Sequence, residues 1–247
     1  MTTAPLLYVC VRPQQGAAAA EYESFRTAMR RDEAHVAHHD LVREPLPEDA
    51  FDRYSGFLVG GSPFNLADPE STKTDVQRRL EADLERIAAR AAEGDGPAAL
   101  FTCYGIGVVT RMLGGEVSRR YPEDTGPVTI ELTEGAASDP LFGNLAKRFT
   151  ALTAHKEGTA ATPPGATLLA RNDACPVQAY VVGDRLYATQ FHPEPTTKAF
   201  TERMAVYRDD GYFEAEHYDV LAARVLAASV TEPARLLRGF AARFGPA

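Results

Sequence analysis

The sequence contains no tryptophan, only three cysteines and no long apolar run. Cys10, Cys103 and Cys175 are too few and too scattered for a disulfide scaffold, and no pair of them has the spacing of a zinc site. A membrane-spanning helix needs about 18 consecutive apolar residues, and no stretch approaches that length. These absences exclude a disulfide-stapled domain and insertion into a membrane, and we expect no bound metal.

Positive charge is also scarce, since 26 lysines and arginines face 34 acidic residues and the net charge is −8. An acidic chain is repelled by a phosphate backbone, so nucleic acid is not an expected partner. The first five residues carry no basic group ahead of the apolar run at residues 6–11, which is not typical of a signal peptide. We therefore expect a cytoplasmic protein.

Strand and helix patterns alternate along the first half of the chain. Short apolar runs that suit strands buried on both faces of a sheet occur at residues 6–11, 36–40, 56–59 and 98–102. Helical patterns lie at residues 21–31, 73–92 and 108–113. Further short β-like runs occur at residues 128–132, 167–170, 177–182 and 186–189. From residue 196 the chain is helical, with segments at 196–208, 214–228 and 231–244.

This order predicts an α/β fold with a mainly parallel central sheet, an antiparallel extension and a C-terminal helical tail. We expect one main domain over residues 1–200, with residues 201–247 as a helical extension packed on the same domain. Leu236, Leu237, Phe240 and Phe244 form an apolar stripe on the last helix. The stripe fits either core packing or the surface of a homodimer, and both interpretations remain open.

Cys103 lies where a predicted buried strand ends and a helix begins. The field of a helix N-terminus stabilises the nucleophilic thiolate over the thiol. Gly105 and Gly107 follow, and they allow a tight turn and leave room for a substrate. The alternative is a small buried residue that only packs, because free cysteine is often buried.

His192 and Glu194 follow the last β-like run, and each precedes a proline. A residue before proline is held in extended backbone, where side chains two positions apart project from the same face. The carboxylate can therefore orient the imidazole while the other ring nitrogen faces a nucleophile, as in a Cys-His-Glu triad. Gly60 and Gly61 end a strand expected to run parallel to the one before Cys103, so their backbone amides are candidates for an oxyanion hole.

Together these residues resemble the class I (triad-type) glutamine amidotransferase family, in its stand-alone, GMP-synthase-like form. The resemblance spans about residues 6–200 and rests on Gly60-Gly61-Ser62-Pro63, Cys103-Tyr104-Gly105, His155 and Gln190-Phe191-His192-Pro193-Glu194. It implies a flavodoxin-like three-layer sandwich and a reaction that needs no cofactor and no metal. It also implies a role for each matched residue: Cys103 as nucleophile, His192 as general base and acid, Glu194 as its orienter, and Gly61 with Tyr104 as oxyanion donors.

The substrate site departs from the pattern of the family. Gly107 stands where the family usually has a glutamine that holds the α-amino and carboxylate end of the substrate, and His155 lies in a segment that lends backbone contacts to glutamine. We expect Gly60, Gly107 and His155 to line the substrate site. Gly107 implies either another contact in place of the lost one or a larger γ-glutamyl substrate that needs the space.

The resemblance implies hydrolysis of the γ-amide of glutamine through a γ-glutamyl thioester on Cys103, with ammonia released for a separate acceptor. Residues 195–247 are too few for a synthetase domain, so any synthetase partner is expected to be a separate chain. A γ-glutamyl hydrolase or transferase acting on a small γ-glutamyl conjugate is the first alternative. The second is a non-catalytic regulatory or binding protein that keeps the fold.

Overall fold

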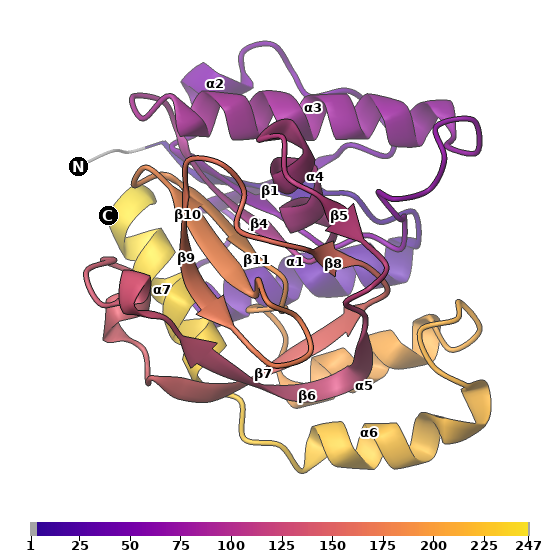
Figure 1. Ribbon diagram of the computed structural model, residues 1–247. Coiled ribbons are helices and arrows are strands. Elements are labelled where there is room, and N and C mark those ends of the chain that lie inside the picture. Colours follow the sequence, from indigo (N-terminus) through magenta and orange to yellow (C-terminus); the bar gives the residue numbers. More distant parts are fainter. Residues whose placement is uncertain (1–3, 247) are drawn as a thin grey trace.

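The computed structural model describes residues 4–246 and is built around a nine-stranded sheet with the order β2-β1-β3-β4-β11-β10-β9-β6-β7 (Figure 1). The strands of this sheet are β1 (Leu6–Cys10), β2 (Val36–Asp40), β3 (Gly56–Val59), β4 (Ala98–Thr102), β6 (Glu123–Leu132), β7 (Arg148–His155), β9 (Ala166–Arg171), β10 (Ala179–Val182) and β11 (Leu186–Thr189). The five strands from β2 to β11 pair in parallel, and the other four continue the sheet in antiparallel pairs. The predicted parallel sheet with an antiparallel extension is confirmed.

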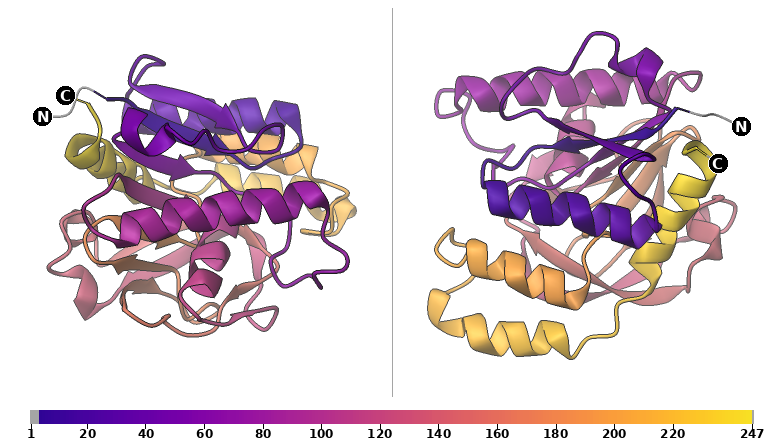
Figure 2. Two further views of the ribbon diagram at one scale, coloured as in Figure 1. Left: turned by 90° about the horizontal axis from the view of Figure 1, so that it is seen from above. Right: turned by 180° about the vertical axis from the view of Figure 1, so that it is seen from behind.

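The helices cover both faces of the sheet and complete the predicted three-layer sandwich (Figure 2). They are α1 (Gln15–Met29), α2 (Ala50–Arg53), α3 (Asp75–Ala92), α4 (Tyr104–Met112), α5 (Thr197–Val206), α6 (Tyr218–Leu226) and α7 (Glu232–Phe244). Single turns of 3₁₀ helix lie at Glu134–Ala136, Phe142–Asn144 and Ala215–His217, and β5 (Val117–Ser118) pairs with β8 (Gly158–Thr159) in a small separate sheet. Among residues 4–246, none of the helices has both the length and the apolar character that crossing a membrane requires.

The central strands are buried on both faces because their side chains alternate between two apolar layers. Tyr8 of β1 packs with α1 and α7, whereas its neighbours Leu7 and Val9 pack with α3 and α4. Every residue of β1, β3 and β4 is buried. The continuous apolar runs of the sequence therefore form strands that are covered on both faces, as predicted.

The apolar stripe of α7 belongs to the core of the single chain. Leu236, Leu237, Phe240 and Phe244 are all buried, and the cluster that they join includes β1 and α1. These side chains therefore form no dimer surface, and a homodimer through another face stays a prediction. The predicted boundary at residue 200, between the main domain and the helical extension, also stays a prediction, and it lies inside α5. Residues 1–3 and 247 of these two predicted parts lie outside the described residues.

Three local predictions differ from the structure. The first helix begins at Gln15 rather than near residue 21, and α4 begins at Tyr104 rather than 108, so both glycines after Cys103 are helical. Strand β7 was not predicted, because its sequence RFTALTAH contains threonines and alanines in place of a strong apolar alternation. Tertiary pairing with β6 decides its conformation, as is common for strands with weak intrinsic signals.

Candidate active site

The candidate catalytic residues lie at the carboxyl ends of three neighbouring parallel strands. Gly60 and Gly61 follow β3, Cys103 follows β4, and β11 leads through Gln190 to His192. β3 and β11 each pair directly with β4, so these ends meet at one edge of the sheet. Open α/β sheets bind ligands at this edge. The predicted parallel pairing of the strand before Gly61 with the one before Cys103 is confirmed.

Cys103 sits in a sharp turn between β4 and α4. Its backbone has φ 51° and ψ −103°, a positive φ that non-glycine residues rarely adopt. The Cys103 N–H donates to the carbonyl of Thr189 at the end of β11, at 2.8 Å, which fixes the turn to the sheet. A Cβ at Gly105 would lie 3.0 Å from the side chain of Phe101, so a larger residue there requires that side chain to shift. The thiol therefore stands at the N-terminus of α4.

His192 and Glu194 are buried and hydrogen-bonded to each other, with 3.0 Å between His192 Nδ1 and Glu194 Oε1. The His192 N–H donates to the carbonyl of Leu152 in β7 at 2.9 Å, so the antiparallel extension also holds this segment. The other side of the imidazole interacts with Cys103, which lines the same cavity. The carboxylate of Glu194, the imidazole of His192 and the thiol of Cys103 thus lie in this order.

Two helices add a buried charge cluster behind Glu194 that the sequence analysis missed. Arg203 of α5 donates to Glu194 Oε1 at 2.7 Å and lies 3.4 Å from Glu21 Oε1 of α1. Arg12 pairs with the same Glu21 oxygen at 2.7 Å, and Tyr8 donates to the other at 2.8 Å. All four charged side chains are buried. A signal existed, because Glu21 and Arg203 lie at helical spacing among apolar residues, on faces where charge is exceptional.

The cluster sets the protonation of the site. Burial alone would lower the pKa of His192, but the negative charges of Glu194 and Cys103 outweigh it and raise that pKa to about 9. Burial would likewise raise the pKa of Glu194, yet His192 and Arg203 hold it far below its usual range. At neutral pH His192 is therefore an imidazolium that faces the thiol, with Glu194 as its ionised partner.

The other two cysteines have a different environment. Burial raises the pKa of the Cys10 thiol to about 11 and that of Cys175 to about 12. Neither borders a cavity among those that surround Cys103. Such burial is typical of cysteines that pack in the core and do not react.

Gly61 lies against the thiol, but its N–H does not point towards it. A Cβ on Gly61 would lie 2.7 Å from Arg12, 2.8 Å from His192 and 3.5 Å from the Cβ of Cys103, so only glycine fits. The N–H donates instead to Glu21 Oε1, at 3.3 Å. An oxyanion role for Gly61 stays a prediction and requires this peptide to turn. Gly60 faces Glu21 too, since its Cβ would lie 2.1 Å from Glu21 Oε2.

Tyr104 is the first residue of α4, where backbone N–H groups lack partners within the helix. Its predicted role as an oxyanion donor rests on that N–H. The phenol points away and donates to Glu81 Oε1 of α3 at 2.7 Å, which anchors the start of α4 to the neighbouring helix. The side chain therefore positions the turn that carries the thiol.

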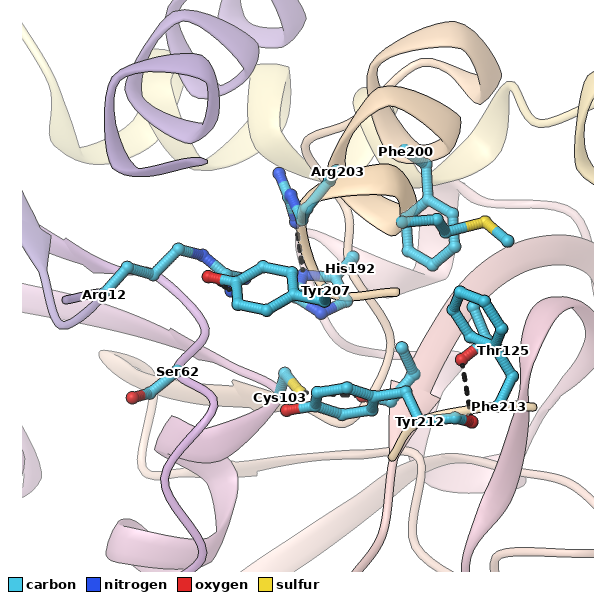
Figure 3. Close-up of a pocket in the computed structure, with 12 residues that line it drawn as sticks. Arg12, Ser62, Cys103, Thr125, His192, Phe200, Arg203, Tyr207, Tyr212 and Phe213 are labelled. Carbon is cyan, nitrogen blue, oxygen red and sulfur yellow. Dashed lines mark hydrogen bonds between the residues drawn. The ribbon is translucent and has the colours of Figure 1, made fainter. Parts of the chain in front are cut away.

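Two cavities meet at Cys103 and share Ser62, Ala154 and Tyr212 in their walls. The first, here named the His192-side cavity, is bordered by His192, Arg12 and Arg203 together with Phe200, Met204, Tyr207 and Phe213 (Figure 3). The second, the Gly107-side cavity, is bordered by Gly107, His155, Lys156, Glu157 and Gln190 among others. Figure 3 shows Cys103 and His192 among the side chains that line the first cavity.

Gly107 and His155 both border the Gly107-side cavity, but their roles in binding stay predictions. A Cβ on Gly107 would make only ordinary contacts, 3.4 Å from Leu66 and 3.7 Å from Val117. The imidazole of His155 has both nitrogens engaged, Nε2 with Glu123 at 2.7 Å and Nδ1 with the carbonyl of Glu157 at 2.9 Å. Its ring therefore braces β7 against β6.

Two buried trios bring potential metal-ligating atoms within 4.8 Å of one another: Glu123 with His155 and Cys175, and Glu21 with His192 and Glu194. In the first, Glu123 already accepts from Asn172 and Gln178 at 2.5 Å each as well as facing His155. In the second, Arg12 and Arg203 neutralise the carboxylates. Hydrogen bonds and ion pairs within the chain thus account for both trios.

Residues 31–207 match the family model for glutamine amidotransferase class-I. The chain belongs to the class-I glutamine amidotransferase family. Within this family, the glutamine-hydrolysing GMP synthase of Thermus thermophilus is 28% identical over 151 residues, which cover 61% of this chain and 26% of that enzyme. Gamma-glutamyl peptidase 3 of Arabidopsis thaliana is 27% identical over 154 residues, which cover 60% of this chain and 57% of that protein.

The chain aligns with only about a quarter of the length of the GMP synthases that it resembles. Solved structures share its fold over nearly its whole length. A glutamine amidotransferase from Thermotoga maritima has a TM-score of 0.75 at 17% identity, with 99% of each chain covered. A glutamine amidotransferase from Methylobacillus flagellatus has a TM-score of 0.73 at 19% identity, with 98% of this chain and 94% of the other covered. The family and the fold predicted from the sequence are both confirmed.

Proposed function

We propose that the chain hydrolyses the γ-amide bond of glutamine, or of another γ-glutamyl compound, with Cys103 as the nucleophile. The observation that carries this proposal is the arrangement of Cys103 at the start of α4 beside His192, whose Nδ1 lies 3.0 Å from Glu194. A nucleophile, a base and an orienting carboxylate in this order are the components of covalent catalysis by a triad.

In the proposed reaction the Cys103 thiolate attacks the γ-carbonyl carbon of the substrate. The tetrahedral oxyanion is stabilised by backbone N–H groups at the start of α4, with Tyr104 as the first donor. His192 transfers its proton to the departing nitrogen, the C–N bond breaks, and a γ-glutamyl thioester remains on Cys103. His192, now neutral, takes a proton from water, which attacks the thioester and releases glutamate.

The protonation of His192 supports its role as the acid. Its pKa of about 9 keeps the proton available for the leaving nitrogen at neutral pH. Arg203 and Glu21 act behind Glu194 as positioning residues, because they keep that carboxylate ionised and fixed without touching the reacting atoms.

The proposal includes a destination for the ammonia. The relatives named above include GMP synthases, of which this chain matches one part, and this supports delivery of ammonia to an acceptor or to a synthetase on a separate chain. A cytoplasmic location is part of the same proposal.

A γ-glutamyl conjugate is the second candidate substrate. Gly107 supports it, because this residue borders the Gly107-side cavity and places no side chain in it. The similarity to Gamma-glutamyl peptidase 3 points in the same direction.

The test measures glutamate and ammonia released from glutamine by the purified chain. We expect Cys103→Ala to lower turnover by about a thousandfold or more, because a triad contributes on that scale, and to keep the fold. Cys175→Ala is the matched control, since this thiol is also buried but lies outside the site. Turnover that survives Cys103→Ala contradicts the proposed mechanism.

A second measurement applies if glutamine gives no product. Covalent labelling of Cys103 by the glutamine-like electrophile 6-diazo-5-oxo-L-norleucine then separates a competent site from an inert one. Labelling that needs Cys103 supports an enzyme with another γ-glutamyl substrate or an activating partner. Without labelling and without turnover of any γ-glutamyl amide, the non-catalytic interpretation replaces this proposal.

A further inference from the structure

The proposed reaction needs hydrogen-bond donors that face the negative charge on the γ-carbonyl oxygen. Donors that are fixed before the charge develops are the most effective, and removing one of them typically costs about 10²–10³ in kcat. The N–H of Tyr104 at the start of α4 is one candidate. The N–H of Gly61 donates to Glu21 at 3.3 Å, and Gly61 borders neither of the two cavities at Cys103. Unless this peptide turns, a second donor has to come from another residue.

The reacting carbonyl must lie where the two cavities meet, because Cys103 borders both of them. Three other residues also border both cavities, namely Ser62, Ala154 and Tyr212. The Ser62 hydroxyl is engaged, since it donates to the carbonyl of Val11 at 2.8 Å, and Ala154 has no polar side chain. The phenol O–H of Tyr212 has no hydrogen-bond partner among the residues that the structure describes. Tyr212 therefore has a free side-chain donor at the point where the carbonyl must lie.

Three contacts hold Tyr212, which lies in the segment between α5 and α6. Its backbone carbonyl accepts from Thr125 Oγ1 of β6 at 3.4 Å. The ammonium of Lys156 lies 4.4 Å from the centre of the Tyr212 ring and donates to the carbonyl of Asp210 at 2.6 Å. The ring of Tyr207 packs edge-on against that of Tyr212, with 6.1 Å between the ring centres. The phenol is thus held by contacts from β6, from the end of β7 and from its own segment.

The free end of this ring faces the nucleophile. Figure 3 shows the phenol of Tyr212 pointing towards Cys103. Burial raises the pKa of Tyr212 well above its usual range, and the negative charge of Cys103 raises it further. The phenol therefore keeps its proton at neutral and mildly alkaline pH. A neutral O–H in this position can donate to a developing oxyanion while His192 carries out the proton transfers.

We propose that Tyr212 is a catalytic residue, whose phenol O–H donates a hydrogen bond to the γ-carbonyl oxygen in the tetrahedral intermediate. The proposal rests on the Cys103 chemistry of the proposed function, and it supplies the donor that Gly61 does not offer in this structure. The hydrogen bond strengthens as the thiolate adds to the carbonyl carbon and charge collects on the oxygen, and it weakens as the carbonyl reforms and the C–N bond breaks. The phenol keeps its proton throughout, so the proton transfers of His192 are unchanged. The same contact serves the second step, in which water attacks the thioester.

The test compares Tyr212→Phe with the unchanged chain in the hydrolysis of glutamine, or of the γ-glutamyl amide that the chain hydrolyses fastest. The substitution removes one hydroxyl and keeps the ring that packs against Lys156 and Tyr207. We expect kcat to fall by about a hundredfold and KM to change by less than about threefold, because the lost hydrogen bond forms mainly in the transition state. Tyr218→Phe is the matched control. The hydroxyl of Tyr218 donates to the carbonyl of Thr201 at 3.3 Å and borders neither cavity, so kcat should stay within about twofold.

A second measurement separates this role from a structural one. Alkylation of Cys103 by iodoacetamide displaces iodide and forms no oxyanion, so its rate in Tyr212→Phe should stay within about twofold of that of the unchanged chain. A substitution that only disturbed the turn at Cys103 would slow alkylation and hydrolysis together. An unchanged kcat, or equal losses in both rates, overturns the inference and leaves the proposed function intact. No hydrolysis of any γ-glutamyl amide by the unchanged chain overturns the inference together with the hydrolysis on which it rests.

Discussion

The positive φ of Cys103 permits a direct test of how the fold presents the thiol. Its backbone has φ 51° and ψ −103°, and such conformations cost a non-glycine residue about 1–3 kcal/mol. The cost arises from the Cβ, which crowds the neighbouring carbonyl oxygen. Cys103→Ala removes the sulfur and keeps the Cβ, whereas Cys103→Gly removes both. The difference between the two variants therefore isolates the strain.

Two opposing contributions set the expected difference in stability between Cys103→Gly and Cys103→Ala. Glycine loses more conformational freedom on folding than alanine, which costs about 0.5–1 kcal/mol. Relief of the strain exceeds this cost, so Cys103→Gly should be more stable than Cys103→Ala by about 1 kcal/mol. In a chain of this size that difference corresponds to about 2–4 °C in Tm.

Thermal and urea unfolding of both variants give the required comparison. Arg30 supplies a matched control, because it is the other non-glycine residue with positive φ in the described chain, at φ 57° and ψ 48°, and it is exposed at the end of α1. Arg30→Gly should likewise exceed Arg30→Ala in stability, by about 1 kcal/mol. If the glycine variant is more stable than the alanine variant at position 30 but not at position 103, the turn at Cys103 stores no strain and the reasoning is refuted.

Three further predictions concern the charged residues of the site and Gly107. Because the pKa of His192 is raised to about 9, kcat/KM should hold through neutral pH and fall as the pH rises through about 9, and Glu194→Gln should move that fall to lower pH. Arg203→Met should cost about 3–5 kcal/mol in urea unfolding, because Glu194 and Glu21 lose the guanidinium that they share; an unchanged midpoint would contradict this. Gly107→Gln should lower KM for glutamine and raise helix stability by up to about 1 kcal/mol, and a higher KM would show that the position is not near the glutamyl end.

The position of Cys103 and His192 at one edge of the sheet could be predicted from the sequence. The apolar runs that precede Gly60-Gly61 and Cys103 predict buried parallel strands. The carboxyl ends of neighbouring parallel strands lie on the same side of a sheet. The proline after His192 restricts its backbone through local sterics alone. These restraints depend on a few consecutive residues, so they can be inferred without the three-dimensional structure.

Glu21 and Arg203 could not be assigned in the same way, because their roles depend on the packing of α1 beside α5. Periodicity places Glu21 and Arg203 on the apolar faces of their helices, but it does not reveal a partner 182 positions away along the chain. The direction of the Gly61 N–H has the same origin. Glu21 attracts it from α1, so an amide expected to face the thiol faces a carboxylate instead.

The buried cluster explains why these missed residues matter for the chemistry. When Cys103 is a thiolate and His192 an imidazolium, three anions, Cys103, Glu21 and Glu194, balance three cations, His192, Arg12 and Arg203. Loss of one arginine leaves a buried cluster with a net negative charge, which favours uptake of a proton at one of the anions. The helices that bury the cluster thus keep Glu194 ionised beside His192, so the stability of the fold and the protonation of His192 depend on the same charges.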